Sequence, residues 1–363
     1  MPQVIVFDDL EKERVAVAES LAAALDDTVQ IHVFDGSKEP REGMSHELHI
    51  EKWLDELPCD GDTALVVCDK ELGIYENLPG LSATAVSVAS FQLGLPFCQY
   101  SREGAEIERD FAQFSRLSRW DSEDITLSGQ SPEEWANEAA ELLRGFVDIA
   151  GALEARGGGQ RRTPASSLAA ILERPTAESK LALYGSGDQL FLREVFGFYD
   201  PEKPDEGVLL QRLPRLLGKW LRLSILRFPG VLANATAAAS YLNIAEDDFA
   251  EPGKRAVFAR AEYEGPFSAS AQGPWWWREE LDVLLGDAGV EDGLTLLRQQ
   301  GLEADECVDP QTGERAGYYC MLTHDPVSRE NSRGGISWFP QGADLARIRR
   351  DKFETLNALV GLF

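Results

Sequence analysis

Residues 3–9 read QVIVFDD and residues 63–69 read TALVVCD. Each stretch is a short apolar run, rich in β-branched residues, that ends in acidic side chains. Such runs are typical of strands buried on both faces of a parallel sheet. The carboxyl ends of parallel strands share one edge of the sheet, where α/β proteins bind their ligands. The two stretches therefore predict a parallel sheet with Asp8, Asp9 and Asp69 at its ligand-binding edge.

The chain around these stretches alternates between strand-like and helix-like segments. Strands are expected at 3–8, 29–34, 63–68, 96–100 and 124–127, and helices near 11–25, 46–57, 81–93, 104–116 and 132–153. This alternation is typical of a sheet with helices on both faces. We therefore expect an α/β fold, a doubly wound five-stranded parallel sheet in the order 2-1-3-4-5, followed by a mainly helical α+β C-terminal region.

A Gly-rich, basic stretch, RGGGQRRTP at 156–164, is typical of a flexible linker. We expect an α/β domain at 1–153, a linker at 154–164, a helical region at 165–250 and an α+β region at 251–363. Within the last region, 254–263 is strand-like, and 275–286, 290–300 and 341–359 are helix-like. Residues 304–308 and 316–322 flank the turn sequence DPQTG, which predicts a β-hairpin.

Charge and cysteine content limit the function classes. The net charge is −27, and residues 1–150 hold 11 basic against 31 acidic residues, a net of −20. Such a field repels phosphate backbones, so nucleic-acid binding through this part is not expected. The five cysteines form no CxxC pair, which favours a reducing, cytoplasmic setting. We expect neither a signal peptide nor a membrane-spanning helix.

Three carboxylates and one hydroxyl are expected at the ligand-binding edge. Asp8 and Asp9 follow the first strand, Asp69 ends the third, and Ser101 follows the fourth. Converging carboxylates repel one another unless a cation joins them. Oxygen ligands favour Mg²⁺, so Asp8, Asp9 and Asp69 are candidate metal ligands. The alternative is that Asp8 and Asp9 only cap the helix that starts near residue 11.

In this order, the acidic pair, the single aspartate and the hydroxyl resemble the receiver domain of response regulators, over about residues 1–150. The resemblance implies that Asp8 and Asp9 hold Mg²⁺, that Asp69 is the phosphoacceptor and that Ser101 senses the phosphoryl group. The family's lysine after the fifth strand is missing from ITLSGQSP at 125–132. Lys70 and Arg102 are nearby cations that could replace it. The departure favours a pseudo-receiver that does not accept phosphate.

A basic amphipathic segment lies at 211–227, with five basic residues and no acid. Arg212, Arg215, Lys219 and Arg222 recur at spacings of three and four, so they share one helical face. The face is either a solvated surface over a local core or a contact for an acidic protein surface, including the N-terminal domain itself. We take the four residues as candidate partner-binding residues.

Residues 275–322 loosely resemble a winged-helix unit. The presumed recognition helix carries Glu291 and Asp292, and the hairpin only Arg315, so protein contact is expected rather than DNA contact. The sequence favours a regulator or adaptor with a receiver-like signalling domain and a protein-binding C-terminal module over an enzyme. The alternative is a phosphorylatable response regulator with an effector enzyme or a DNA-binding output. A tight polar pocket lined by residues such as Arg315, His324, Asp325 and Arg329 would favour an enzyme.

Overall fold

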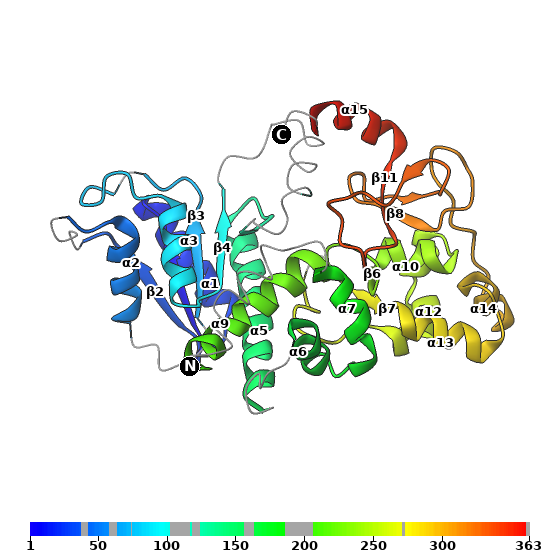
Figure 1. Ribbon diagram of the computed structural model, residues 1–363, viewed down its shortest axis with the longest axis horizontal. Helices are drawn as coiled ribbons and strands as arrows, with labels where there is room; N and C mark the ends of the chain where they lie inside the picture. Colours follow the sequence, from blue (N-terminus) through cyan, green and yellow to red (C-terminus); the bar gives the residue numbers. More distant parts are fainter. Residues whose placement is uncertain are drawn as a thin grey trace. The chain divides into compact units, whose positions relative to one another are not determined.

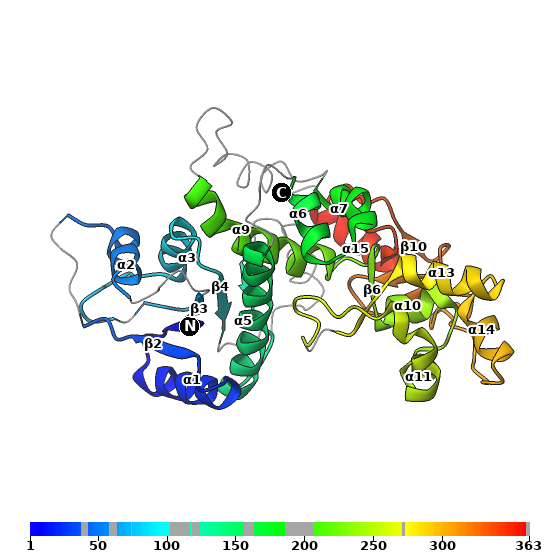
Figure 2. The same cartoon turned by 90° about the horizontal axis from the view of Figure 1, so that it is seen from below.

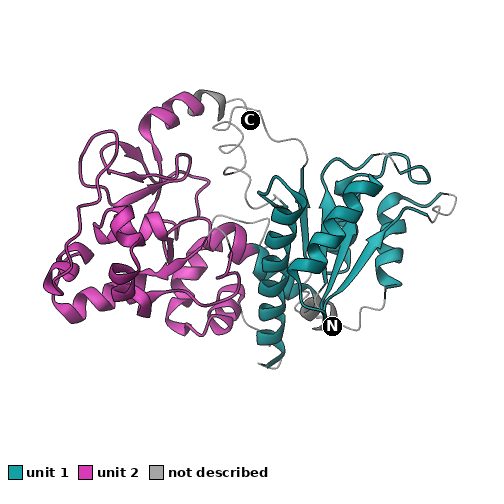
Figure 3. Ribbon diagram, turned by 180° about the vertical axis from the view of Figure 1, so that it is seen from behind, with its two compact units in different colours: residues 1–105, 123–162, 193–219 teal, residues 106–122, 163–192, 220–363 magenta. Residues whose placement is uncertain are grey.

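A computed structural model describes residues 1–37, 43–57, 64–73, 75–101, 117, 124–155, 163–185, 206–270 and 273–360. Contacts divide the chain into two compact units, teal and magenta in Figure 3. The first unit comprises Met1–Ala105, Glu123–Arg162 and Arg193–Lys219. The second comprises Glu106–Ser122, Thr163–Leu192 and Trp220–Phe363.

The first unit is built on a five-stranded sheet in which every strand is parallel to its neighbours. Its strands are β1 (Gln3–Phe7), β2 (Gln30–Phe34), β3 (Ala64–Asp69), β4 (Phe97–Tyr100) and β5 (Ile125–Thr126). The order is β2-β1-β3-β4-β5, as predicted. All residues of β1 and β3 are buried, as expected for apolar runs covered on both faces.

Helices cover both faces of this sheet. They are α1 (Glu11–Ala24), α2 (His46–Asp55), α3 (Ala83–Gln92) and α5 (Pro132–Ala155). Helix α9 (Glu206–Trp220) belongs to this unit up to Lys219 and packs on α3 and α5. Figure 2 shows α1 with α5 on one face and α2 with α3 on the other. Ser45 and Ser82 start α2 and α3 by accepting backbone N–H groups through their side chains. The predicted helix near 104–116 lies outside the described residues.

One side of the sheet packs through an aromatic cluster. Phe34 lies within 4.9 Å of Phe7 and of Trp53, ring centre to ring centre, and 5.4 Å from Tyr75. Gly36 follows β2 with φ of +66° and lies so close to the Tyr75 ring that a Cβ there would overlap it. The glycine therefore lets Tyr75 reach over the carboxyl edge of the sheet.

The second unit is mostly helical up to residue 261 and contains two small sheets (Figure 1). Its helices are α6 (Pro164–Ile171), α7 (Glu178–Gly185), α10 (Ala235–Leu242), α11 (Glu246–Ala250), α12 (Pro252–Arg255), α13 (Arg278–Ala288), α14 (Gly293–Gln299) and α15 (Arg350–Val360), with a π-helical turn at Leu221–Ile225 and 3-10 turns at Pro175–Ala177 and Ala256–Ala261. Its strands are β6 (Leu232–Asn234), β7 (Trp275–Trp277), β8 (Tyr318–Cys320), β9 (Pro326–Val327), β10 (Ser332–Arg333) and β11 (Ala346–Arg349). One sheet has the order β10-β11-β8-β9, and β6 pairs with β7.

Both ends of the range predicted as a linker, 154–164, lie in or next to helices. Helix α5 continues to Ala155, and Thr163 already caps α6, whose first residue is Pro164. Proline is favoured at this first helical position because its missing N–H has no partner there anyway. Residues 156–162 lie outside the described residues.

Two element predictions in the C-terminal region are wrong. The three tryptophans at 275–277 form β7 instead of opening a helix, and all are buried. Pairing with β6 fixes them as a strand, because its register sets Trp275, Trp276 and Trp277 opposite Asn234, Ala233 and Leu232. Residues 254–263 are mainly helical rather than a strand, since Pro252 starts α12 and a 3-10 turn follows.

Two further predictions need correction. The predicted helix at 341–359 starts only at Arg350, because β11 pairs with β8 and β10. The predicted hairpin arms at 304–308 and 316–322 form no regular ladder. They are joined by the isolated bridge of Val308 with Arg315 and by the bond from the Ala316 N–H to the carbonyl of Cys307. Strand β8 instead pairs with β9 and β11, so this segment does not form the two-stranded wing of a winged helix.

Helix α14 and its end follow the prediction. Asp292 accepts the backbone N–H of Thr295 and caps the helix start. Gly301 follows the helix with φ of +75°, the left-handed conformation that favours glycine after a helix. Among the residues that the structure describes, we find no helix with both the length and the apolar character needed to cross a lipid bilayer.

We expect Gly36→Ala to destabilise the protein more than Gly80→Ala. Both glycines have positive φ, but only a Cβ at Gly36 would overlap another group, the Tyr75 ring. The overlap should add about 1–3 kcal/mol to the backbone strain that both variants share. Thermal unfolding followed by circular dichroism measures the difference. Equal losses in the two variants would show that Tyr75 is not held against Gly36.

Candidate functional site

The three predicted aspartates lie together at the carboxyl edge of the first unit's sheet. Asp8 and Asp9 follow β1 and Asp69 ends β3. One carboxylate oxygen from each lies within 4.8 Å of the others. Asp8 and Asp69 are fully buried, and Asp9 is partly exposed. Parallel neighbours β1 and β3 produce this proximity because their carboxyl ends coincide.

Each carboxylate oxygen of Asp8 accepts a hydrogen bond from a described residue. The backbone N–H of Leu10 donates to Oδ1 at 2.8 Å, and the Tyr100 hydroxyl donates to Oδ2 at 2.5 Å. The Tyr100 ring stacks on Trp135 of α5 with ring centres 4.4 Å apart. Burial, then the negative charge of Asp8, raises the pKa of Tyr100 far above its usual value, so the phenol stays a donor.

The backbone carbonyl of Asp8 has donors as well. The Tyr75 hydroxyl donates to it at 2.8 Å, and Arg14 Nη1 of α1 donates at 3.2 Å. Tyr75 also reaches the carbonyl of Phe34 at 3.2 Å. The loop after β3 is thereby tied to the ends of β1 and β2, beside the aspartates.

Asp9 and Asp69 accept backbone N–H groups from the same loop. Gly73 donates to Asp9 Oδ2 at 3.0 Å, and Glu71 donates to Asp69 Oδ1 at 3.1 Å. The N-cap of α1 is Leu10, and Asp9 contacts a residue 64 positions away, so capping of α1 does not account for the acidic pair. These N–H bonds offset part of the repulsion among the carboxylates.

Ser101 follows β4, as predicted, and donates its hydroxyl to Glu71 Oε1 at 2.7 Å. Glu71 lies in the loop directly after Asp69, so Ser101 is linked to the aspartates through a fourth carboxylate. A further anion at this edge would be repelled by the Glu71 carboxylate as well as by the three aspartates.

Ser128 occupies the end of the fifth strand, where the receiver family has its lysine. Leu127 continues the pairing of β5 with β4 through its N–H bond to the carbonyl of Gln99. Ser128 comes next, and both its N–H and its hydroxyl donate to Glu138 Oε2, at 2.7 and 3.0 Å.

Lys70 is one of two cations that could replace the lysine. Its backbone N–H extends the pairing of β3 with β4, and the residue is exposed. Arg102 lies outside the described residues.

The edge therefore presents a compact set of oxygen ligands. No histidine or cysteine takes part in the acidic group. Oxygen-only sets of this kind suit a hard divalent cation, with Mg²⁺ completing its coordination with waters. Sequence reasoning missed Tyr75, Tyr100 and Glu71. A signal for Tyr100 existed, because a tyrosine inside a buried strand needs a partner for its hydroxyl.

The four predicted partner-binding residues do not form an exposed basic face. Arg215 and Arg222 are only 7% and 4% exposed. Arg212 and Lys219 are half-buried, and Arg222 lies in the π-helical turn after α9. The spacing of three and four persists, but burial removes the solvated face that it predicted.

The first part of this basic segment packs within the first unit. Arg212 Nη2 donates to the carbonyl of Gln92 at 2.6 Å. The guanidinium groups of Arg212 and Arg215 lie 5.9 and 5.1 Å from the ring centre of Phe91. Gly218 lets α9 approach α5, since a Cβ there would overlap the ring of Phe146. These arginines thus join α9 to the end of α3.

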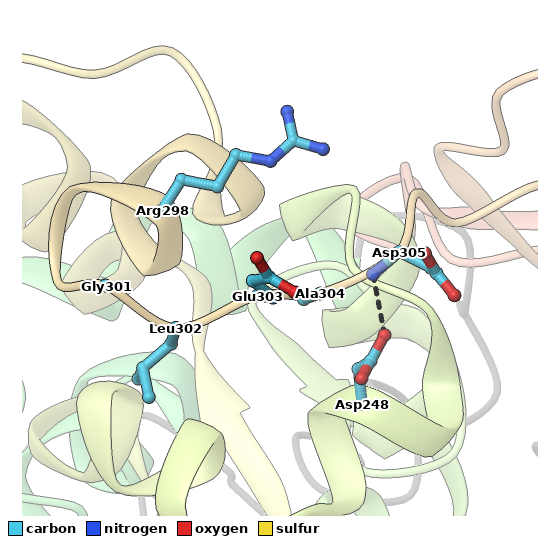
Figure 4. A pocket seen from close by; sticks show the side chains of 7 residues that line it. All are labelled: Asp248, Arg298, Gly301, Leu302, Glu303, Ala304 and Asp305. Atoms are coloured by element: carbon cyan, nitrogen blue, oxygen red, sulfur yellow. Dashed lines mark hydrogen bonds between the residues drawn. The ribbon is translucent and has the colours of Figure 1, made fainter.

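Three of the four residues that would have lined an enzymatic pocket are engaged with other side chains, and the fourth, Arg329, is exposed. Arg315 lies 3.5 Å from Asp292, Asp325 lies 3.3 Å from Arg349, and His324 contacts the Tyr319 hydroxyl. Two cavities of the second unit, of 680 and 600 Å³, are lined by other residues. The larger one lies along 301–305, where the Asp305 N–H donates to Asp248 (Figure 4).

No known family, no curated protein and no solved structure matches the chain. The sheet order β2-β1-β3-β4-β5 is consistent with a receiver-like fold of the first unit.

We expect Tyr100→Phe to lower the free energy of unfolding by about 1–3 kcal/mol, because the buried Asp8 carboxylate loses its hydroxyl donor. Tyr318→Phe is the matched control, since no hydrogen bond to the Tyr318 hydroxyl is found among the described residues. Urea unfolding followed by circular dichroism measures both variants. Similar losses of unfolding free energy in the two variants would mean that the Tyr100 hydroxyl does not stabilise the buried Asp8 carboxylate.

Proposed function

We propose that the protein is a regulator or adaptor whose first unit is a pseudo-receiver domain, and whose second unit binds a protein partner. The observation that carries this proposal is the position of Asp8, Asp9 and Asp69 at the carboxyl edge of a sheet in the order 2-1-3-4-5. The hydroxyl of Ser101 follows the neighbouring strand β4. Together these features match the resemblance to receiver domains in both order and placement.

Mg²⁺ is the cofactor that the acidic edge would hold. The donor set fits it, because each of the three carboxylates contributes an oxygen within 4.8 Å of the others. Each carboxylate oxygen has more than one lone pair, so the N–H and O–H donors leave acceptor capacity for a cation. A bound cation would neutralise part of the repulsion that these side chains impose on the folded state.

Three features favour a pseudo-receiver over a phosphorylated receiver. The fifth strand is followed by Ser128, whose hydroxyl is bound to Glu138, rather than by a lysine. Without that lysine, a phosphoryl group on Asp69 would lack a charge-assisted donor. Ser101 is held by Glu71, which places a further carboxylate beside any phosphoryl group. The field of the first 150 residues, with a net charge of −20, opposes the same group.

We expect Mg²⁺ to raise the thermal midpoint of the protein in a saturable way, because a ligand that binds only the folded state stabilises it. The shift should be smaller in Asp9→Asn, which removes one partly exposed ligand. Glu133→Gln removes an exposed carboxylate on α5. It is the control for nonspecific screening of the acidic surface by Mg²⁺. Differential scanning fluorimetry at constant ionic strength measures all three proteins. An identical shift in Asp9→Asn would remove the metal site from the proposal.

We expect little or no phosphorylation of the protein by acetyl phosphate with Mg²⁺, measured by intact mass. Ser128→Lys should increase labelling, because it supplies a cation at the end of β5, and Asp69→Asn should abolish that gain. Robust labelling of the unchanged protein that disappears in Asp69→Asn would contradict the pseudo-receiver. It would support the phosphorylatable response regulator instead.

A further inference from the structure

Several arginines of the second unit are neutralised by a nearby carboxylate. Six of them lie within 4.0 Å of an aspartate or glutamate oxygen: Arg174, Arg255, Arg260, Arg278, Arg315 and Arg349. This is the expected state in a chain with a net charge of −27, where acids outnumber bases by 62 to 35.

Four arginines near the C-terminus differ from these six. Within the described part of the chain, Arg329, Arg333, Arg347 and Arg350 have no carboxylate oxygen within 4.0 Å. Arg329, Arg333 and Arg350 are exposed, and Arg347 is half-buried. We call these four residues the arginine patch.

The patch lies on two segments that are paired with each other. Ser332 and Arg333 form β10, which pairs antiparallel with Arg349 and Ile348 of β11. Arg350 follows β11, and its Nη2 donates to the carbonyl of Glu330 at 2.9 Å. The four arginines are therefore brought together by the pairing of 329–333 with 347–350.

Arg347 is fixed in place by neutral groups. Its Nε and Nη2 donate to the hydroxyl and carbonyl of Ser332 at 2.6 and 3.2 Å, and its guanidinium lies 4.6 Å from the ring centre of Tyr318. Gly334 leaves room for it, since a Cβ there would lie 2.5 Å from Nη1. Partial burial and the nearby charge of Arg329 lower the pKa of Arg347. Among the described residues, the carboxylate of Glu330 acts on Arg347 only from beyond 4.0 Å, so like charges are held together without a direct ion pair.

We propose that the arginine patch binds an acidic, extended segment of a partner protein. Guanidinium groups pair with carboxylates in a forked geometry, which suits such a segment. β10 is one of the two edge strands of its sheet, so a peptide could also pair with its main chain. The inference rests on the proposed function, because it names the partner chemistry of the second unit.

A labelled peptide of eight glutamates, titrated with the full-length protein and followed by fluorescence anisotropy, tests the patch. The variant Arg329→Gln/Arg333→Gln/Arg350→Gln removes three exposed charges and leaves Arg347 in place. The control Arg260→Gln/Arg298→Gln/Arg315→Gln changes the net charge equally, at three exposed arginines outside the patch. Circular dichroism checks that both variants fold. The single variants Arg329→Gln and Arg333→Gln replace the triple variant if it does not.

We expect the patch variant to weaken binding at least about tenfold and the control to change it by less than about threefold. Binding should also weaken as salt increases. No binding of the peptide, or equal losses in the two variants, would overturn the proposal. Tighter binding of an eight-nucleotide DNA through the same arginines would also overturn it, because the partner would then be a nucleic acid. The Mg²⁺ titration of the first unit tests the pseudo-receiver separately, since no patch residue belongs to its acidic edge.

Discussion

The burial of the Asp8 carboxylate is the constraint on which the first unit depends. Removing an ionised group from water costs several kcal/mol of free energy. In the folded state, hydrogen bonds to the charged group must offset this cost. Leu10 and Tyr100 supply these bonds, and Trp135 holds the tyrosine ring in place. One side chain thereby connects β1, β4 and α5. The loop that carries Tyr75 closes over the same residue from the other side of the sheet.

The strands of the first unit could be predicted from sequence because their signal is local and repeated. Val4, Ile5 and Val6 form an uninterrupted apolar run, and such a run is stable only when both faces are covered. The acidic residues at the ends of β1 and β3 could then be placed by geometry, since parallel strands end at one edge. The hydrogen-bond partners of these acidic residues could not be predicted from the sequence. Nothing local reveals that Tyr100 reaches Asp8, 92 residues away.

The error at 275–277 shows where the prediction of short elements from sequence reaches its limit. Three consecutive tryptophans are too short a stretch to show a period of two or of 3.6, so pairing with β6 decided their conformation. The arginines of α9 show that local sequence is an equally limited guide to a functional surface. Their spacing identified one helical face, but packing decided that Arg215 would lie over Phe91 rather than in solvent. Long cationic side chains cover apolar surface readily, so charge alone does not identify an exposed face.

The first unit is assembled from separate stretches of the chain, and this affects how it folds during translation. Helix α9 belongs to that unit, yet it follows α5 only after α6 and α7 of the second unit have been made. At translation rates of about 5–20 residues per second, the nascent sheet waits on the order of seconds before α9 leaves the ribosome. During this time the rings of Phe91 and Phe146 lack their contacts with α9. The unit therefore completes its surface late, and this interval is when a chaperone would have access to it.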